Sequence, residues 1–450
     1  MTDTPYGNSM ELRITYCKVE YFQGVDTLVY VISIDGKPLM PCKPVIARLL
    51  LKQHKAKVIK KYPFTIKLLY KTKTEYTQPL TLGIDTGSSK IGSAVVDENN
   101  NVLYLSQVEV RNDITDKMKQ RAKYRRNRRN RKTRYRKARW LNRKNSIKED
   151  RFSPTIVSKI NSHLKEINFV KSILPIQNVI LETATFDPYA LKNPAVLHNK
   201  WLYQKGVNYG FANTRAYVLG RDNYTCQYCN GKSKDSKLEI HHIIFRSQGG
   251  SDESKNLITL CKTCHGKLHN GKINLKKNGK VKGQLKHATQ MNSIRQQLLR
   301  LLPEATETFG FITKEHRQLM KLPKEHYYDA VAIACLNNIG NTGLIGVNFK
   351  TKNILFKRCI ADGDFQQTKG VRSEQRIITG KIQGFRKLDK VEYQGKEYFI
   401  KGRMSTGYAI LMDIEGNKIN LKPIPKFEKM KRMQARKSWI ISQETIQNIC

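Results

Sequence analysis

The chain has 450 residues, of which 39% are hydrophobic, so it is long enough for several domains with real cores. Its 82 Lys and Arg residues against 37 Asp and Glu residues give a formal net charge of +45, which excludes an ordinary neutral metabolic enzyme and predicts a polyanionic partner. A membrane surface is the competing polyanion, but no apolar run approaches the length of a spanning helix. The start of the chain lacks a signal-peptide pattern, and the odd number of cysteines, nine, favours a reducing compartment.

The first part of the chain predicts a small basic αβ unit. Residues 1–27 match no recognisable element, and we treat them as an extension of unknown role. From residue 28 onward the patterning predicts a strand, a proline-punctuated loop, a short helix and a second strand, at 28–33, 38–44, 44–58 and 61–70.

Residues 80–110 predict three strands joined by tight turns, and Asp85 closes the first of them. Antiparallel strands of this kind open an RNase H-like sheet. They also open sugar kinases, in which the corresponding loop binds phosphate. The segment alone leaves both interpretations open.

Residues 117–144 are the most basic part of the chain, and no proline or glycine interrupts them. A long helix is therefore expected, although repulsion between its like charges would destabilise it in water. Phosphates would remove that repulsion, and the planar arginine fork suits them. A solvated tail or localisation signal is the alternative, but the run lies between two expected core segments. We expect nucleic-acid binding by Arg121, Arg125, Arg126, Arg128, Arg129, Arg131, Arg134, Arg136 and Arg139.

Further acids follow elements that look buried. A helical stripe over 154–174 precedes a strand at 178–183 that carries Glu182. Residues 307–336 predict a strand, a connection and a helix that starts near Pro323, with His326 and Asp329 on one face. If Asp85, Glu182 and Asp329 converge, their oxygens suit a pair of Mg²⁺ ions. Three unrelated acids are the alternative.

Residues 226–269 hold two Cys-x-x-Cys pairs, Cys226 with Cys229 and Cys261 with Cys264. Each pair can bind one ion from a tight turn, so the four predict a tetrahedral structural Zn²⁺. The histidines of this stretch remain for a second, catalytic metal, and the alternative is a zinc ribbon with incidental histidines.

This stretch resembles an HNH (ββα-metal) nuclease module. The resemblance implies that His242 is the general base and that Asn256 orients it. It also implies that His241 and His265, with His269, bind a catalytic divalent cation. Many HNH modules have aspartate where His241 stands, which leaves the metal preference open.

The order of the motifs resembles IscB, a compact, transposon-encoded relative of the CRISPR type II effector nuclease. GKPLMPCKP at 36–44, GIDTGSSKIG at 83–92, the arginine run, VILE at 179–182 and KEHYYDA at 324–330 follow in the order of that family. The resemblance implies a RuvC metal site of Asp85, Glu182, His326 and Asp329.

The implied fold class is α/β and multidomain, an RNase H-like (RuvC) mixed sheet with an inserted ββα-metal HNH module and a C-terminal small β domain. The alternating runs of the last hundred residues fit a small, basic β-barrel or sandwich. The expected parts are the N-terminal extension, the PLMP module, RuvC part I, the arginine-rich bridge helix, RuvC part II, the HNH module, RuvC part III and the C-terminal β domain, at residues 1–27, 28–72, 79–112, 113–146, 150–190, 205–280, 281–345 and 346–450.

The implied function is RNA-guided cleavage of double-stranded DNA, in which HNH cuts the strand paired with a guide (omega) RNA and RuvC cuts the displaced strand. The arginine helix would grip the guide, and the C-terminal domain would contact DNA flanking the target. The expected cofactors are Mg²⁺ or Mn²⁺ at both sites and a structural Zn²⁺. We expect a monomer within a ribonucleoprotein, located in a prokaryotic cytoplasm near the nucleoid or in an organelle, with no membrane partner.

Three alternatives remain beside this reading. An HNH homing-type nuclease without a guide explains residues 215–275 and leaves the three acids unexplained. A non-cutting regulator would need broken sites, and a Holliday-junction resolvase would not need the inserted HNH module.

Overall fold

The computed structural model describes residues 28–446, apart from 73, 131–151, 188, 192, 207, 276–283, 339–345, 352 and 362–380. Its internal contacts divide the chain into two units, residues 1–183 with 296–450, and residues 184–295. Several mixed sheets with helices confirm the α/β, multidomain class. Across the described residues, no helix has the length and apolar character needed to span a bilayer.

The N-terminal sheet has the strand order β2-β1-β4-β3 and packs against one helix. Its elements are β1 Val29–Ile32, β2 Pro38–Cys42, α1 Pro44–Lys52, β3 Ala56–Lys60 and β4 Thr65–Leu68. The expected loop over 38–44 is thus mostly the strand β2. This strand lies at the edge of the sheet, where a proline is tolerated because its missing backbone N–H can face away from the neighbouring strand. The expected helix over 44–58 ends at Lys52, and its last part is β3, after a turn in which His54 has a φ of 55°.

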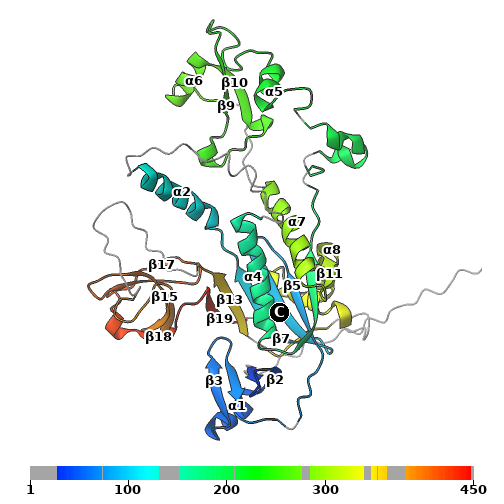
Figure 1. Ribbon diagram of the computed structural model, residues 1–450, viewed down its shortest axis with the longest axis vertical. Helices are drawn as coiled ribbons and strands as arrows, with labels where there is room; N and C mark the ends of the chain where they lie inside the picture. The colour runs from blue at the N-terminus through cyan, green and yellow to red at the C-terminus, as the bar shows by residue number, and fades with distance from the viewer. Residues whose placement is uncertain are drawn as a thin grey trace, which may run out of the picture. The chain divides into compact units, whose positions relative to one another are not determined.

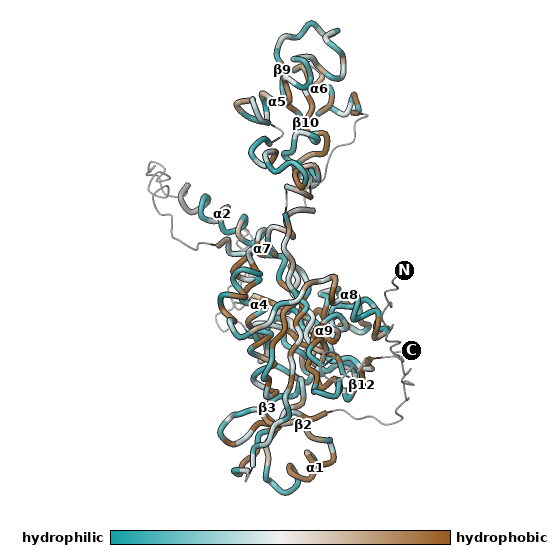
Figure 2. Tube along the Cα trace, turned by 90° about the vertical axis from the view of Figure 1, so that its right-hand side faces the viewer, coloured by the Kyte–Doolittle hydropathy of each residue, from teal (hydrophilic) through white to brown (hydrophobic). Residues whose placement is uncertain are grey.

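The central sheet of the first unit has eight strands in the order β11-β8-β5-β6-β7-β13-β19, with β12 paired to β7. Its first three strands in sequence, β5 to β7, are antiparallel as expected. Figure 1 shows β5 and β7 beside α4, and Figure 2 shows hydrophobic segments between α4 and α9. The strands are β5 Leu80–Asp85, β6 Lys90–Asp97, β7 Asn101–Glu109, β8 Ile176–Thr183, β11 Thr306–Phe309, β12 Asn348–Phe349, β13 Asn353–Cys359 and β19 Trp439–Thr445.

Two helices cover opposite faces of this sheet. Successive side chains of a strand point to opposite faces, so neighbouring residues contact different helices. On β6, Ala94 packs in the cluster that includes Val331 of α9 His326–Ala334. Its neighbour Ser93 points the other way and donates a hydrogen bond to Glu166 of α4 Pro154–Lys171. The strand and helix expected at 178–183 and 154–174 are both present.

Two further helices belong to the first unit, α2 Ile114–Asn130 and α8 Gly310–Leu319, and α7 Gln284–Leu301 crosses the boundary between the two units. The expected connection after β11 is therefore largely the helix α8, and α9 begins at His326 rather than near Pro323. α2 is the first part of the expected arginine-rich helix. Of its arginines, Arg121 to Arg126 are described with side chains, Arg128 and Arg129 by backbone alone, and Arg131, Arg134, Arg136 and Arg139 lie outside the described residues.

The C-terminal region differs from the small separate β domain expected over 346–450. β13 pairs in parallel with β7 and antiparallel with β19, so both strands extend the central sheet. The residues between these two strands in the sequence form a separate antiparallel sheet with the strand order β17-β16-β15-β14-β18. An alternating pattern of polar and apolar residues predicts a strand but does not show which sheet the strand joins. The strands of the separate sheet are β14 Lys390–Tyr393, β15 Lys396–Arg403, β16 Ala409–Met412, β17 Lys418–Ile419 and β18 Lys431–Gln434.

The second unit contains a small ββα fold. Its elements are α5 Thr214–Arg221, β9 Leu238–His242, β10 Leu257–Cys261 and α6 Lys262–His269. β9 and β10 form a two-stranded antiparallel sheet. Asn213 caps α5, since its side chain accepts a hydrogen bond from the backbone N–H of Ala216 at 2.9 Å.

A fully buried ion pair joins distant parts of the first unit. Lys357 Nζ of β13 lies 2.8 Å and 2.7 Å from the two carboxylate oxygens of Glu166 on α4. Both side chains have 0% exposure, and Ser93, Ser106 and Tyr104 donate hydrogen bonds to the same carboxylate. Burial alone would raise the pKa of Glu166, but Lys357 and the hydroxyl donors outweigh it and hold that pKa low.

We expect Lys357→Met to destabilise the first unit by about 3–5 kcal/mol, because it leaves a buried carboxylate without its counter-charge. The double variant Lys357→Met with Glu166→Gln should recover much of that loss, since the amide oxygen still accepts from the three hydroxyls. Denaturant unfolding of both variants measures this. Equal stabilities of the single and double variants would contradict the assignment.

Candidate metal centres

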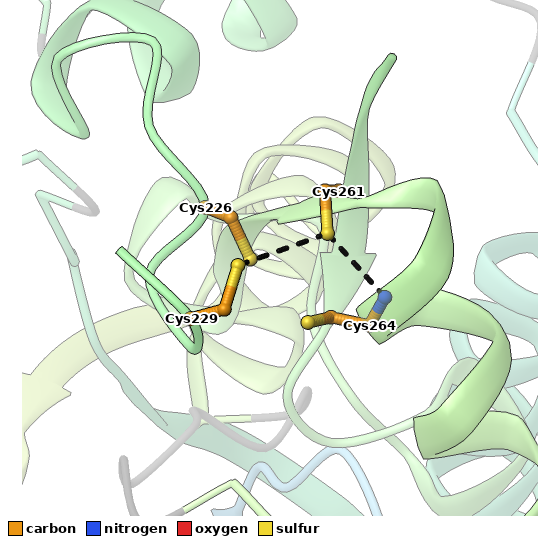
Figure 3. Close-up of side chains that lie close together, drawn as sticks. All are labelled: Cys226, Cys229, Cys261 and Cys264. Carbon is orange, nitrogen blue, oxygen red and sulfur yellow. Dashed lines mark hydrogen bonds between the residues drawn. The ribbon is translucent and has the colours of Figure 1, made fainter. Parts of the chain in front are cut away.

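The four cysteines of the Cys-x-x-Cys pairs converge in the second unit (Figure 3). Their Sγ atoms all lie within 4.8 Å of one another, and Cys226, Cys261 and Cys264 are buried. Cys261 ends β10 and caps α6, because its Sγ accepts from the Cys264 N–H at 3.4 Å. The backbone N–H of Gln227 donates to Thr259 O at 2.9 Å and ties the first pair to β10.

The chemistry of these thiols fits a soft divalent cation. The Ser233 hydroxyl lowers the pKa of Cys229 to about 6, whereas burial and the neighbouring thiols raise the pKa of Cys264. Four crowded thiols cannot all ionise without a positive charge among them. Zn²⁺ would supply that charge and bind them tetrahedrally.

A second cluster in the same unit consists of His241, His265 and His269, whose ring nitrogens lie within 4.8 Å of one another. His265 and His269 are four residues apart on α6, and their Nε2 atoms are 3.2 Å apart. Burial and the two other imidazoles lower the pKa of His241 to about 4, so its ring is neutral at neutral pH. Neutral imidazoles are good ligands for a divalent cation.

His242 and Asn256 lie beside this cluster with different surroundings. The His242 side chain is 22% exposed, and its Nε2 lies 2.9 Å from Asp252 Oδ1. Asn256 is fully buried. Its amide accepts from the Ile244 N–H at 2.9 Å and donates to the carbonyls of Ile244 and Ser251 at 3.0 Å and 2.8 Å. These bonds fix the backbone just beyond His242.

Sequence reasoning did not find two acids that contact this cluster. Glu239 Oε2 lies 2.6 Å from His265 Nδ1, which leaves His265 Nε2 facing His269. Asp252 contacts His242 and also Arg246, whose Nε lies 2.7 Å away. Glu239 stands two residues before His241 on one strand, and this spacing could have placed both on one face.

The acids of the first unit meet at one end of the central sheet. Asp85 of β5 is paired in register with Glu182 of β8, so parallel neighbours place both carboxylates on the same face. Opposite them, α9 brings His326, whose Nδ1 lies 2.6 Å from Asp85 Oδ2. Asp329 is one turn further along α9, and Arg317 Nε of α8 lies 2.7 Å from its Oδ1.

Two glycines allow α9 to approach this closely. A Cβ on Gly83 of β5 would lie 2.3 Å from the Ala330 carbonyl, and one on Gly92 of β6 would lie 1.9 Å from the His326 carbonyl. Both distances are far inside van der Waals contact. The absence of a side chain at these positions is therefore what lets the helix backbone lie on the sheet.

The electrostatics of this cluster favour a bound cation. Burial, together with Asp85 and Asp329, raises the pKa of Glu182 to about 7. Burial and Asp85 also raise the pKa of Asp329, although Arg317 opposes that change. A hydrogen bond with Asp85 raises the pKa of His326. Mutually repelling carboxylates are the donors that Mg²⁺ prefers.

The ligand atoms of this acidic cluster do not all converge within 4.8 Å, whereas those of the cysteine and histidine clusters do, among the residues the structure describes. Two of these acids are instead engaged in ion pairs, Asp85 with His326 and Asp329 with Arg317. Arg317 was not expected from the sequence, because it stands twelve positions before its partner Asp329 and no spacing rule links α8 to α9.

Family models match two consecutive stretches of the chain. One, described as RRXRR protein, matches residues 29–206, and a second, described as HNH endonuclease, matches residues 226–271. The first stretch contains Asp85, Glu182 and the described arginines of α2, and the second contains the cysteine and histidine clusters. The chain is an endonuclease, and the two matches support its likeness to the IscB nucleases. As an HNH endonuclease, this IscB-like nuclease depends on a divalent metal.

Curated relatives match short stretches of the IscB-like nuclease. Anaredoxin from Nostoc sp. is 38% identical over 58 residues, which are 13% of this chain and 74% of that protein. The type IV methyl-directed restriction enzyme EcoKMcrA from Escherichia coli is 33% identical over 64 residues, which are 13% of this chain and 23% of that protein.

Among solved structures, Streptococcus thermophilus Cas9 in complex with the AGAA PAM is similar with a TM-score of 0.31 and 12% identity. That match covers 58% of this chain and 32% of Cas9. The complex with the AGGA PAM gives a TM-score of 0.32 and 11% identity, over the same shares of the two chains. The IscB-like nuclease therefore spans about a third of the length of these structures.

We expect Cys226→Ser to lose stoichiometric zinc and to unfold the second unit, because a two-stranded sheet with short helices is marginal without its metal. Metal analysis and limited proteolysis of residues 184–295 measure this. Cys42→Ser, which removes a partly buried thiol of the N-terminal sheet, is the control and should keep its zinc. Unchanged zinc in the Cys226 variant would refute the four-cysteine site.

Proposed function

We propose that this IscB-like nuclease is an RNA-guided DNA endonuclease with two cutting centres. The observation that carries the proposal is that one chain has two separate clusters of different donor chemistry. One cluster consists of imidazoles and the other of carboxylates with one imidazole. One cutting centre for each strand of a duplex accounts for both.

In the acidic cluster, Asp85, Glu182 and Asp329 would hold Mg²⁺ or Mn²⁺, with His326 beside Asp85. Such ions orient an attacking water and stabilise the leaving oxygen of a phosphodiester. Arg317 would move from Asp329 as the cation enters, since both compete for one carboxylate. We assign this centre to the displaced DNA strand, the role of the RuvC centre.

In the HNH module, His241, His265 and His269 would hold the divalent cation that stabilises the leaving oxygen. His242 would take the proton from the attacking water, and the partly exposed ring is open to such a water. Asn256 would act on His242 through the backbone that it fixes. This centre would cut the strand paired with the guide.

The partners follow from the charge. A net charge of +45 favours extended contact with phosphate backbones, and α2 presents Arg121, Arg125 and Arg126 toward a guide RNA. The sheet of β14 to β18 would contact duplex DNA beside the target, and base pairing with the guide would read the sequence. We propose a monomer within a ribonucleoprotein, associated with a transposon.

An HNH homing-type endonuclease without a guide is the second candidate. It is favoured by the compact second unit, residues 184–295, which contains the whole HNH match. It gives no use for the in-register pair Asp85 and Glu182 or for the helix packed against them. We therefore prefer the guided function.

Expression of the chain with its native flanking DNA, purification at moderate salt and sequencing of the bound RNA test the guide directly. We expect one discrete transcript with a variable 5′ part and a structured 3′ part, because a guide needs both a pairing segment and a protein-binding scaffold. Heterogeneous host RNA that salt removes would mean a generic electrostatic attraction and would favour the homing-type nuclease.

We expect Asp85→Ala and His242→Ala each to abolish cutting of one strand, a different one in each case, because the two centres act separately. Loss of a general base costs about 10²–10⁴-fold in rate. Strand-labelled cleavage gels of the guide-loaded protein measure this. Glu304→Ala and His198→Ala, which remove exposed side chains outside both clusters, should cut both strands. Loss of both cuts in either test variant would contradict the two-centre mechanism.

A further inference from the structure

A cavity of about 520 Å³ opens beside α4, away from the metal clusters. We call it the α4 pocket. Its lining combines a face of α4, residues at the end of the β13–β19 pair, and the side chains of Arg111 and Phe152. A volume of this size suits a nucleotide-sized ligand.

The α4 wall is polar because of how the helix divides its faces. Val157, Ser158, Asn161, Ser162 and Lys165 are three or four residues apart and line the pocket together. The opposite face carries Ile160, Ile167 and Val170, which are buried in the core. Hydrogen-bonding groups therefore point into the cavity from several levels of the same helix.

Two of the described lining residues, Arg111 and Lys165, are cationic, and none of the described lining residues carries a carboxylate. Besides the α4 wall, the lining consists of Arg111, Phe152, Pro154, Cys359, Ile360 and Ser438. Arg111 Nε lies 2.9 Å from Asp113 Oδ1, but the other oxygen of that carboxylate lies 2.8 Å from Lys117 Nζ. The single carboxylate of Asp113 thus pairs with two cations, so the Arg111–Asp113–Lys117 group keeps a net positive charge. Lys165 Nζ contacts the Ser438 hydroxyl and lies 4.2 Å from the centre of the Trp439 ring.

Apolar groups complete the lining. Phe152 lies two residues before α4, and Pro154 and Val157 lie in its first turn. An aromatic ring beside cations and hydroxyls is the combination that binds an unstacked base together with its phosphate. Arg111 also stands three residues before the start of α2, so the pocket borders the N-terminal end of the arginine-rich helix.

We propose that the α4 pocket binds one unstacked nucleotide of the guide RNA, an inference that rests on the proposed RNA-guided function. Phe152 stacks on the base, and Arg111 and Lys165 contact the flanking phosphates. Ser158, Asn161 and Ser438 offer partners for a 2′-hydroxyl, the group that separates RNA from DNA. The pocket thereby fixes where the guide leaves the arginine helix.

Ultraviolet crosslinking of the purified ribonucleoprotein, followed by ribonuclease and trypsin digestion and mass spectrometry, tests the pocket. Trypsin cuts after Arg151 and Lys159, so the expected nucleotide adduct lies on the peptide 152–159. We expect Phe152→Ala to reduce this adduct at least about fivefold, in line with the usual contribution of one stacked base. Phe152→Tyr should retain it.

Charge is tested with a matched pair of variants. Arg111→Gln should weaken the adduct on 152–159. Lys171→Gln should not, because Lys171 lies at the far end of α4, is paired with Glu304 at 2.9 Å, and does not line the pocket. Thermal unfolding of each variant confirms that the fold is kept. Equal losses in both variants would overturn the pocket in favour of general electrostatics.

Oligonucleotide probes separate failure of this inference from failure of the proposed function. A short 4-thiouridine RNA should crosslink at 152–159, and the matching 4-thiothymidine DNA should do so at least fivefold less. Equal crosslinking of the two would overturn the ribonucleotide assignment. A discrete bound transcript without any adduct at 152–159 would overturn the pocket and leave the guided function standing. Heterogeneous bound RNA would overturn the guided function, with the RNA probe still testing the pocket.

Discussion

The close approach of α9 to the central sheet is the contact on which the acidic centre depends. Gly83 and Gly92 leave room for backbone against backbone, and a methyl group at either position would lie within 2.3 Å of a carbonyl oxygen. Because the helix lies this close, His326 reaches Asp85, and Asp329 faces the same end of the sheet. Tertiary packing alone then holds Glu182 and Asp329, which burial and neighbouring carboxylates make reluctant to ionise, beside Asp85.

The buried pair of Lys357 and Glu166 binds the first unit from the other face of the same sheet. Residues 191 positions apart meet in an interior with no solvent to screen them. A buried pair of this kind contributes little net stability over apolar residues of similar size, but removing one partner is costly. The pair therefore favours the correct fold, because Lys357 contacts Glu166 only when β13 lies beside β7.

We expect the fold of the second unit to need a bound metal ion, whereas apolar packing stabilises the first unit. A two-stranded sheet and two short helices bury little apolar surface, and ligand binding supplies the missing free energy in domains of this kind. The cysteine cluster and the histidine cluster both lie on β9, β10 and α6 or the turn before them. A structural ion held by Cys261 and Cys264 at one end of α6 would thus also position the imidazoles on that helix.

The sequence by itself determined the residues that carry chemistry, because metal spacing, strand-end acids and an arginine run are local patterns. The four cysteines, the histidines of β9 and α6, and Asp85 with Glu182 could all be named from it. Only the tertiary structure decided that β13 and β19 join the central sheet, that Arg317 holds Asp329, and that a basic pocket forms beside α4. Alternation predicts a strand but not its partner, and contacts between separate elements depend on register and helix packing, which no local pattern encodes.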